Sequence, residues 1–162
     1  MTHLHGNVLV QKNHPRIAFR GWIDALEAEI LLAQEAARET PALLTALQER
    51  LDFVRGLIRA DVLNEPVKVV RLCGLDDKAL REHSHFPQKY YGQPHFMPAY
   101  TDGLAMLRLN RVRTMVRQAE LSCYDAFSDR DGVITRGDIL TALNRLSSFC
   151  WILMIRLKAG KL

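Results

Sequence analysis

Asn-Arg-Val-Arg-Thr-Met-Val-Arg-Gln-Ala-Glu (110–120) lies inside a long apolar-periodic segment and carries two stripes of different character. The polar stripe consists of Arg113, Arg117 and Glu120, which follow one another at i, i+4 and i+7. The apolar stripe steps by three and four residues, which at 3.6 residues per turn places it on the core face of a helix: Leu109, Val112, Val116, Ala119 and Cys123. The stretch therefore predicts a helix that points two guanidinium groups and one carboxylate in the same direction.

The polar stripe has two interpretations. A row of guanidinium groups could clamp a polyanion, because each planar fork of donors matches phosphate or carboxylate oxygens. The same row could be a solvated helix face with an internal i,i+3 ion pair, worth about 0.2–0.5 kcal/mol. From these residues alone the solvated face is favoured.

Apolar residues at helical spacing recur along most of the chain and predict four long helices. These are expected at about 15–39, 40–62, 101–127 and 136–158. A proline in the first turn of each of the first two suits a helix start, where its missing N–H is not needed. Because almost no loop separates these two helices, we expect them to lie antiparallel.

The region 64–100 is the irregular part of the chain, since it holds four of the six prolines. Asp76 and Asp77 predict the start of one short helix, which ends at about 84. A strand-like stretch at 8–10 has no convincing partner. We therefore expect an all-α fold, with one domain over residues 1–162 built as a ferritin-like, up-down antiparallel bundle of four long helices and one short helix.

Composition limits the classes of protein and partner. A chain of 162 residues that is 48% hydrophobic and 25% charged is typical of a soluble globular protein. The net charge of +4 suits an anionic ligand but is too small and dispersed to indicate nucleic acid. No signal-peptide pattern opens the sequence, and the longest apolar run, 149–155, is far shorter than the ~20 residues that span a bilayer. Three widely spaced cysteines predict reduced, partly buried thiols in a cytoplasmic protein: Cys73, Cys123 and Cys150.

Two patterns that imitate metal sites are given other interpretations. The turn Asp-Arg-Asp-Gly (129–132) resembles part of a calcium loop, but Phe127 and Asp138 would stand at its first and twelfth positions, where strong ligands are required. Three histidines of the irregular region are interpreted as ordinary loop residues, since no cysteine or carboxylate is placed to complete a tetrahedron: His83, His85 and His95. The sequence thus predicts no protein metal site, and it contains none of the standard nucleotide-binding motifs.

Four separate stretches follow one another in the order of a known family. They are Lys-Asn-His-Pro-Arg (12–16), Gly-Trp-Ile-Asp (21–24), Arg-x-x-x-Arg-x-x-Glu (113–120) and Leu-Asn-Arg-Leu-Ser (143–147). Together they resemble the ATP:cob(I)alamin (corrinoid) adenosyltransferases of the propanediol-utilisation type. The resemblance is closer to the catalytic part of the ethanolamine-utilisation type, through 13–20, 58–61, 64–66, 74–75 and 113–117.

The resemblance implies a reaction and a set of site residues. Such enzymes transfer the 5′-deoxyadenosyl group of ATP to cob(I)alamin and release triphosphate, with Mg²⁺ held mainly by the triphosphate and water. Residues 1–14 would lie on the nucleotide side and 64–100 on the corrin side. The implied catalytic residues are Asp24, Arg113 and Arg117, with Arg113 paired to Asp24 across a subunit boundary. The implied ATP-binding residues are Lys12, Arg16, Arg113, Arg117, Glu120 and Asn144, and His95 or Phe96 would cover the lower corrin face.

The resemblance also implies partners. It predicts a homotrimer with intersubunit sites, a cobalamin reductase and an adenosylcobalamin-dependent lyase as partners, and neither nucleic acid nor a membrane. It leaves open a place within a bacterial microcompartment. Two alternatives remain: a non-catalytic corrinoid- or ATP-binding carrier on the same bundle, and a generic helical interaction module.

The sequence departs from the family pattern at its N-terminal end. The propanediol branch has a glycine- and threonine-rich phosphate loop where this sequence has His-Leu-His-Gly-Asn (3–7). The ethanolamine branch carries an N-terminal histidine-cysteine metal motif ahead of the part resembled here.

Overall fold

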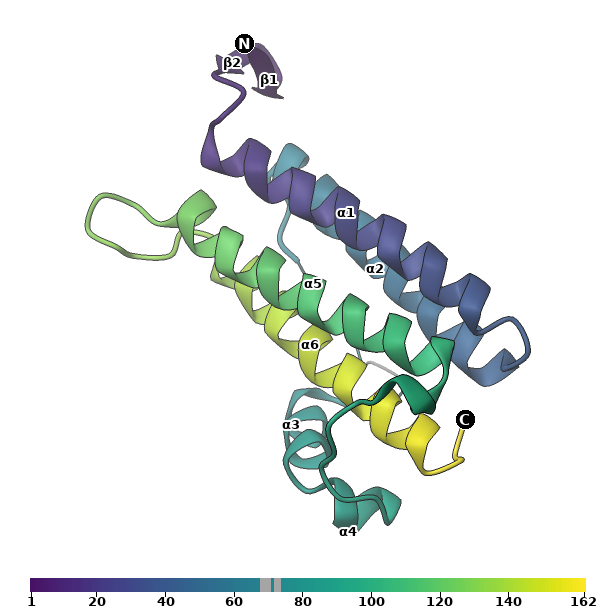
Figure 1. Ribbon diagram of the computed structural model, residues 1–162. Coiled ribbons are helices and arrows are strands. Elements are labelled where there is room, and N and C mark those ends of the chain that lie inside the picture. Colours follow the sequence, from purple (N-terminus) through teal and green to yellow (C-terminus); the bar gives the residue numbers. More distant parts are fainter. Residues whose placement is uncertain (68–70, 72–73) are drawn as a thin grey trace.

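The computed structural model describes residues 1–67, 71 and 74–162, so the thiol predicted at Cys73 lies outside the described residues. Four long helices form an antiparallel bundle in which α5 packs against both α1 and α6 (Figure 1). They are α1 (Pro15–Ala36), α2 (Pro41–Leu63), α5 (Leu104–Phe127) and α6 (Gly137–Lys158). The predicted all-α bundle of four long helices is confirmed.

The local sequence fixes where α1 and α2 begin and where α2 ends. Pro15 and Pro41 occupy the first turns of the two helices. The Nδ1 atom of His14 accepts a hydrogen bond from the backbone N–H of Arg16 at 3.2 Å, which caps α1. Asn64 ends α2 with φ 53°, a left-handed conformation that asparagine adopts more readily than most residues.

The core of the bundle contains the apolar stripe that the sequence predicts for α5. Phe19 of α1 meets Phe127 of α5 edge-on, with ring centroids 5.3 Å apart. Cys123 and Cys150 are buried free thiols, and burial raises the pKa of each to about 12. The five stripe residues are all 0% exposed: Leu109, Val112, Val116, Ala119 and Cys123.

By length and composition alone, α6 is apolar enough to cross a membrane, and among the described helices no other passes that test. However, 61% of its most apolar window is buried inside the bundle. Its inward side packs in the same core as α5, for example through Leu143, Leu146 and Leu153. This burial accounts for the apolar character of α6 without a membrane.

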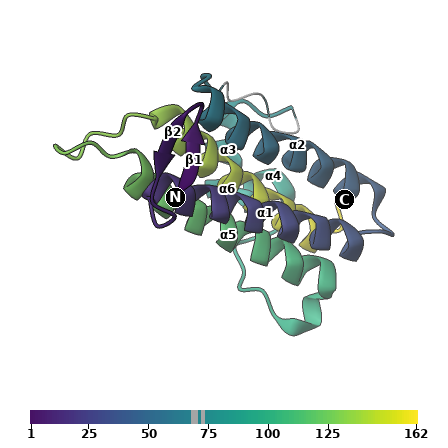
Figure 2. The same cartoon turned by 90° about the horizontal axis from the view of Figure 1, so that it is seen from above.

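The N-terminal segment differs from the prediction. Residues 8–10 do have a partner, because β1 (Thr2–His5) and β2 (Val8–Val10) pair antiparallel as a small hairpin. Gly6 makes the tight turn possible with φ 48°, a conformation that costs glycine little. The hairpin lies beyond the start of α1 (Figure 1), and Figure 2 shows it at the same end of the bundle, seen from above.

The described residues of the region 64–100 form two short helices where the sequence predicted one. They are α3 (Asp77–His85) and α4 (Pro87–Tyr91), and the 3-10 turn η1 (Tyr100–Asp102) precedes α5. The predicted helix start is correct, since Asp76 caps α3 through a hydrogen bond from Ala79 N–H. Pro87 divides α3 from α4, because a residue that precedes proline is disfavoured in helical conformation. The loop that follows begins at Gly92 and ends at Gly103, both with positive φ (70° and 87°).

A buried carboxylate joins α1 to α2. Asp61 of α2 is 0% exposed and accepts hydrogen bonds from Nε and Nη2 of Arg16 at 3.0 and 2.5 Å. Its other oxygen accepts from Nε of Arg20 at 2.7 Å. Two arginines on successive turns of α1 thus compensate one buried negative charge.

Removing this carboxylate leaves two largely buried guanidinium groups uncompensated. We expect Asp61→Ala to lower the free energy of unfolding by about 3–5 kcal/mol, as measured by urea denaturation. The matched control is Asp52→Ala on the same helix, whose carboxylate is exposed and should cost within about 0.5 kcal/mol. Equal effects of the two substitutions would contradict a structural role for the Asp61 ion pairs.

Candidate functional site

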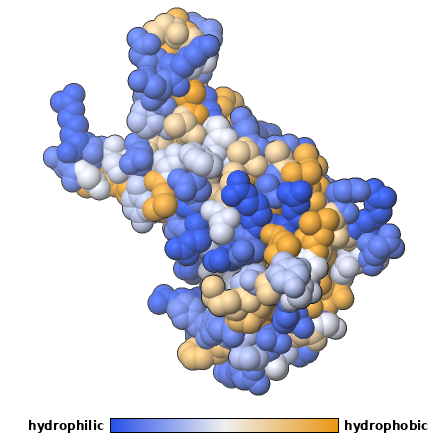
Figure 3. Space-filling model, viewed as in Figure 1, coloured by the Kyte–Doolittle hydropathy of each residue, from blue (hydrophilic) through white to orange (hydrophobic). Residues whose placement is uncertain are grey.

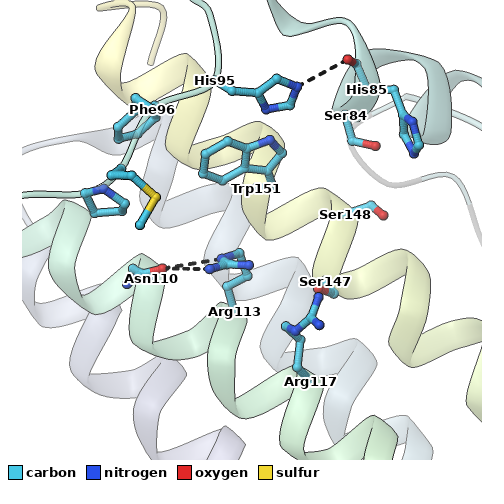
Figure 4. A pocket seen from close by; sticks show the side chains of 12 residues that line it. Ser84, His85, His95, Phe96, Asn110, Arg113, Arg117, Ser147, Ser148 and Trp151 are labelled. Atoms are coloured by element: carbon cyan, nitrogen blue, oxygen red, sulfur yellow. Dashed lines mark hydrogen bonds between the residues drawn. The ribbon is translucent and has the colours of Figure 1, made fainter.

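A cavity of about 650 Å³ opens between α5, α6 and the loop that precedes α5 (Figure 4). One wall is polar and comes from successive turns of the two long helices. The other wall is largely aromatic and comes from residues 95–98. The lining residues are Ser84, His85, His95, Phe96, Met97, Pro98, Asn110, Arg113, Arg117, Ser147, Ser148 and Trp151.

The polar wall contains two guanidinium groups without a carboxylate partner in the described part of the chain. Nε and Nη2 of Arg113 donate to Oδ1 of Asn110 at 3.3 and 3.2 Å. Burial and the like charge of Arg117 lower the pKa of Arg113 from its ordinary value. Arg117 is exposed and makes no ion pair with the described residues. The wall can therefore accept a multiply charged anion.

The aromatic wall is stacked on Trp151 of α6. The rings of His95 and Phe96 lie nearly parallel to the indole, with centroid distances of 5.7 and 5.4 Å. His95 is held further by its Nε2–H, which donates to the carbonyl oxygen of His85 at 3.3 Å. This wall therefore presents flat, apolar surface to the cavity, and the Nε2 atom of His95 is already used.

Glu120 lies about one turn after Arg117 on α5, and Asn144 lies about one turn before Ser147 on α6. Both are therefore just beyond the cavity wall. Nδ2 of Asn144 donates to Oε1 of Glu120 at 3.0 Å. Oδ1 of Asn144 accepts from Nη1 of Arg145 at 3.1 Å, and Nη2 of Arg145 donates to Asp77 of α3 at 3.0 Å. These contacts fix the orientation of the Asn144 amide.

The predicted site residues fall into two groups in space. Arg113, Arg117, Glu120 and Asn144 come together on facing sides of α5 and α6, and His95 and Phe96 close the same cavity. The other predicted residues do not line this cavity: Lys12 is exposed after the hairpin, Arg16 is bound to Asp61, and Asp24 is exposed on α1 without an ion pair to any described residue.

Sequence reasoning missed Trp151, which contacts both walls. Its signal was present, because Trp151 follows Asn144 at i+7, with Ser147 and Ser148 between them, so that all four share one side of α6. Asn110, three residues before Arg113, was missed in the same way.

The two imitations of metal sites have structural explanations. Oδ1 of Asp129 accepts hydrogen bonds from the backbone N–H groups of Asp131 and Val133, each at 2.9 Å, so it organises its own turn. His83 stacks on Tyr90 and bonds the hydroxyl of Tyr91 at 2.7 Å. Over the described ranges, no three histidine, cysteine or carboxylate side chains gather as a metal site would require.

Fold and site define a class of protein: the chain belongs to the cobalamin adenosyltransferase family, whose family model matches residues 1–157. Among individual relatives, it is 36% identical over 156 residues to the corrinoid adenosyltransferase EutT of Escherichia coli (strain K12) and 35% identical to that of Salmonella typhimurium (strain LT2). Each alignment covers 96% of this chain and 57% of the relative, so the chain spans little more than half the length of these relatives. The resemblance found in the sequence is confirmed. No solved structure matches the chain.

The polar wall should bind inorganic triphosphate without any other ligand. We expect Arg117→Ala to weaken this binding by about 10-fold or more in isothermal titration calorimetry, because a charge-assisted hydrogen bond contributes about 1.5–3 kcal/mol. The control is Arg111→Ala, an exposed arginine of the same helix that lies near Glu29 instead. An equal loss in both variants would mean that triphosphate follows net charge rather than this wall.

Proposed function

We propose that this chain transfers the 5′-deoxyadenosyl group of ATP to cob(I)alamin, which yields adenosylcobalamin and triphosphate. The observation that carries the proposal is the pairing, in one cavity, of a cationic wall with a flat aromatic wall. A triphosphate requires the first, and a corrin macrocycle suits the second. The relatives are named corrinoid adenosyltransferases, which supports the same conclusion.

In this reaction an electron pair of cobalt(I) forms a bond to the 5′ carbon of ATP while the bond from that carbon to the triphosphate oxygen breaks. The protein contributes position and charge. Arg113 and Arg117 bind the triphosphate and stabilise the negative charge that grows on it as it leaves. Glu120 and Asn144 complete the nucleotide pocket, in which the oriented amide both donates and accepts.

His95 and Phe96 cover the lower face of the corrin ring. A ring that covers this face keeps a nitrogen ligand away from cobalt, which makes cobalt(II) easier to reduce. The stacking of both rings on Trp151 supports a covering role, because it orients them as flat surfaces at the cavity. If cob(II)alamin bound with MgATP gave a nitrogen-ligated, five-coordinate spectrum that vanished in His95→Ala, the covering role would be wrong.

Mg²⁺ enters with ATP, held by the triphosphate and water. Lys12 lies outside the cavity of its own subunit, so it would supply a further phosphate cation across a subunit boundary. The reduced corrinoid comes from a cobalamin reductase, and an adenosylcobalamin-dependent lyase consumes the product. We place the protein in the cytoplasm, within a microcompartment where one is formed.

The active form is a homotrimer with sites between subunits. Among the described residues, Asp24 of α1 has no cationic partner and Arg113 has no carboxylate partner. The two side chains are therefore complementary in charge and could pair between subunits. Figure 3 shows apolar patches beside a hydrophilic band on the face where α1 and α5 lie. Exposed leucines on these helices account for apolar surface that a second copy would cover: Leu31, Leu32, Leu104 and Leu107.

Anaerobic mixing of chemically reduced cobalamin with MgATP tests the activity directly. We expect loss of the cob(I)alamin absorbance with release of one triphosphate per adenosylcobalamin. Arg117→Ala should lower kcat/KM by about 100-fold or more, because it removes stabilisation of the leaving group. Arg111→Ala should retain the activity.

The outcomes also separate the alternatives. Tight binding of ATP or corrinoid by the native protein without turnover would favour the non-catalytic carrier. Retention of ligand binding in every single variant of the site would favour a generic helical interaction module.

The intersubunit site is tested by complementation. Asp24→Ala and Arg113→Ala are each expected to be inactive, because either one breaks the ion pair at every interface. Subunits of the two variants, unfolded together and refolded at equal ratio, should recover activity, since about one quarter of the interfaces then join an intact Asp24 to an intact Arg113. No recovery, with oligomers of native size, would contradict a pair between subunits.

A further inference from the structure

Trp151 stands between the two walls of the cavity and contacts both (Figure 4). Its indole stacks with His95 and Phe96 of the loop at 5.7 and 5.4 Å. The guanidinium carbon of Arg113 lies 5.7 Å from the centroid of the indole ring system. One rigid side chain thus connects the aromatic wall to the cationic wall.

We infer that Trp151 is a positioning residue that couples corrin binding to ATP binding, an inference that rests on the proposed function. A corrin ring bound to His95 and Phe96 acts on the indole through its stacking contacts. A triphosphate bound to Arg113 acts on it through the guanidinium contact. In this inference both ligands favour the same position of the indole. Because such coupling is reciprocal, each ligand raises the affinity of the other by the same factor.

The contacts of Arg113 explain why it depends on the indole. Asn110 supplies one neutral oxygen, at 3.2 and 3.3 Å, and no carboxylate of the described chain fixes the guanidinium. Within one subunit, the plane of Arg113 is therefore set by Asn110 and by the face of Trp151. A shift of the indole changes where the donor fork points, and geometric fit of that fork determines its affinity for phosphate.

The contacts of the loop explain how a ligand bound to it affects the position of Trp151. Beyond its stacking on Trp151, the loop is tied to the end of α6 by the ion pair of Lys158 with Asp102. The Lys158 ammonium also lies 5.6 Å from the ring centroid of Phe96. The loop is thus attached to α6 at two places, and a ligand that moves it must displace the indole or break the ion pair.

The experiment uses cob(II)alamin, which lacks the electron pair needed to attack ATP, so that both ligands bind without reaction. The affinity for MgATP is measured by calorimetry with and without cob(II)alamin. The native protein should bind MgATP about 5-fold more tightly or better when cob(II)alamin is present. In Trp151→Leu this ratio should fall to below about 2, while Trp151→Phe, which keeps an aromatic face, should retain most of it.

The matched control is Trp22→Phe, which changes the other tryptophan of the chain, a half-buried residue of α1 outside the cavity. In this variant the ratio of MgATP affinities with and without cob(II)alamin should equal that of the native protein. The inference is overturned if Trp151→Leu keeps the native ratio, if the native ratio is one, or if Trp151→Leu loses MgATP affinity equally with and without the corrinoid. A native protein that consumes cob(I)alamin but has a ratio of one retains the proposed function and loses only the coupling.

A second measurement keeps the test decisive if Trp151→Leu does not fold. In Trp22→Phe the indole of Trp151 is the only tryptophan fluorophore. MgATP alone should shift its emission, because triphosphate binding changes the charge that lies against the indole. An emission spectrum unchanged at saturating MgATP would overturn the inference.

Discussion

Burying the apolar stripe of α5 against α1 and α6 fixes the rotation of that helix about its own axis. Because side chains leave a helix at set angles, this rotation also fixes the direction of Arg113 and Arg117. The hydrophobic effect thus aims the cationic groups, and no ion pair within the described chain is needed to hold them. The same groups stay available to a ligand, since no internal carboxylate neutralises them.

The arginines at the two ends of the α1–α5 pair have different roles. At the end near the hairpin, Arg16 and Arg20 are used to compensate the buried Asp61, so their charge is largely committed to the fold. Toward the other end, Arg113 contacts the amide oxygen of Asn110 and the indole of Trp151, and no carboxylate of the described residues pairs with it. The same kind of side chain therefore has two roles in this protein: some arginines stabilise the fold, and others remain free to bind a ligand. An arginine beside a buried carboxylate has the first role.

Periodicity predicted the four long helices, because burial of one face leaves a 3.6-residue pattern that the sequence records directly. It failed at the hairpin, where pairing depends on the left-handed turn at Gly6, and after about residue 84, where the short helix α4 begins at Pro87 in a stretch expected to be a loop. The site was predicted where motif residues share a helix face, as with Arg113 and Arg117. Trp151 was missed because its importance comes from contacts with a loop that lies about fifty residues earlier in the chain, and such distances are set by packing rather than by spacing.

The loop between Gly92 and Gly103 has a consequence for how the protein can change. Both glycines have positive φ, and the loop is attached to the bundle chiefly at its aromatic residues and at Asp102. Its length and sequence can therefore vary without disturbing the register of α5. One residue inserted within α5 would instead turn Arg113 and Arg117 by about 100° relative to the core. Insertions and deletions can thus reshape the aromatic wall in small steps, whereas one insertion in α5 would displace the whole cationic wall at once.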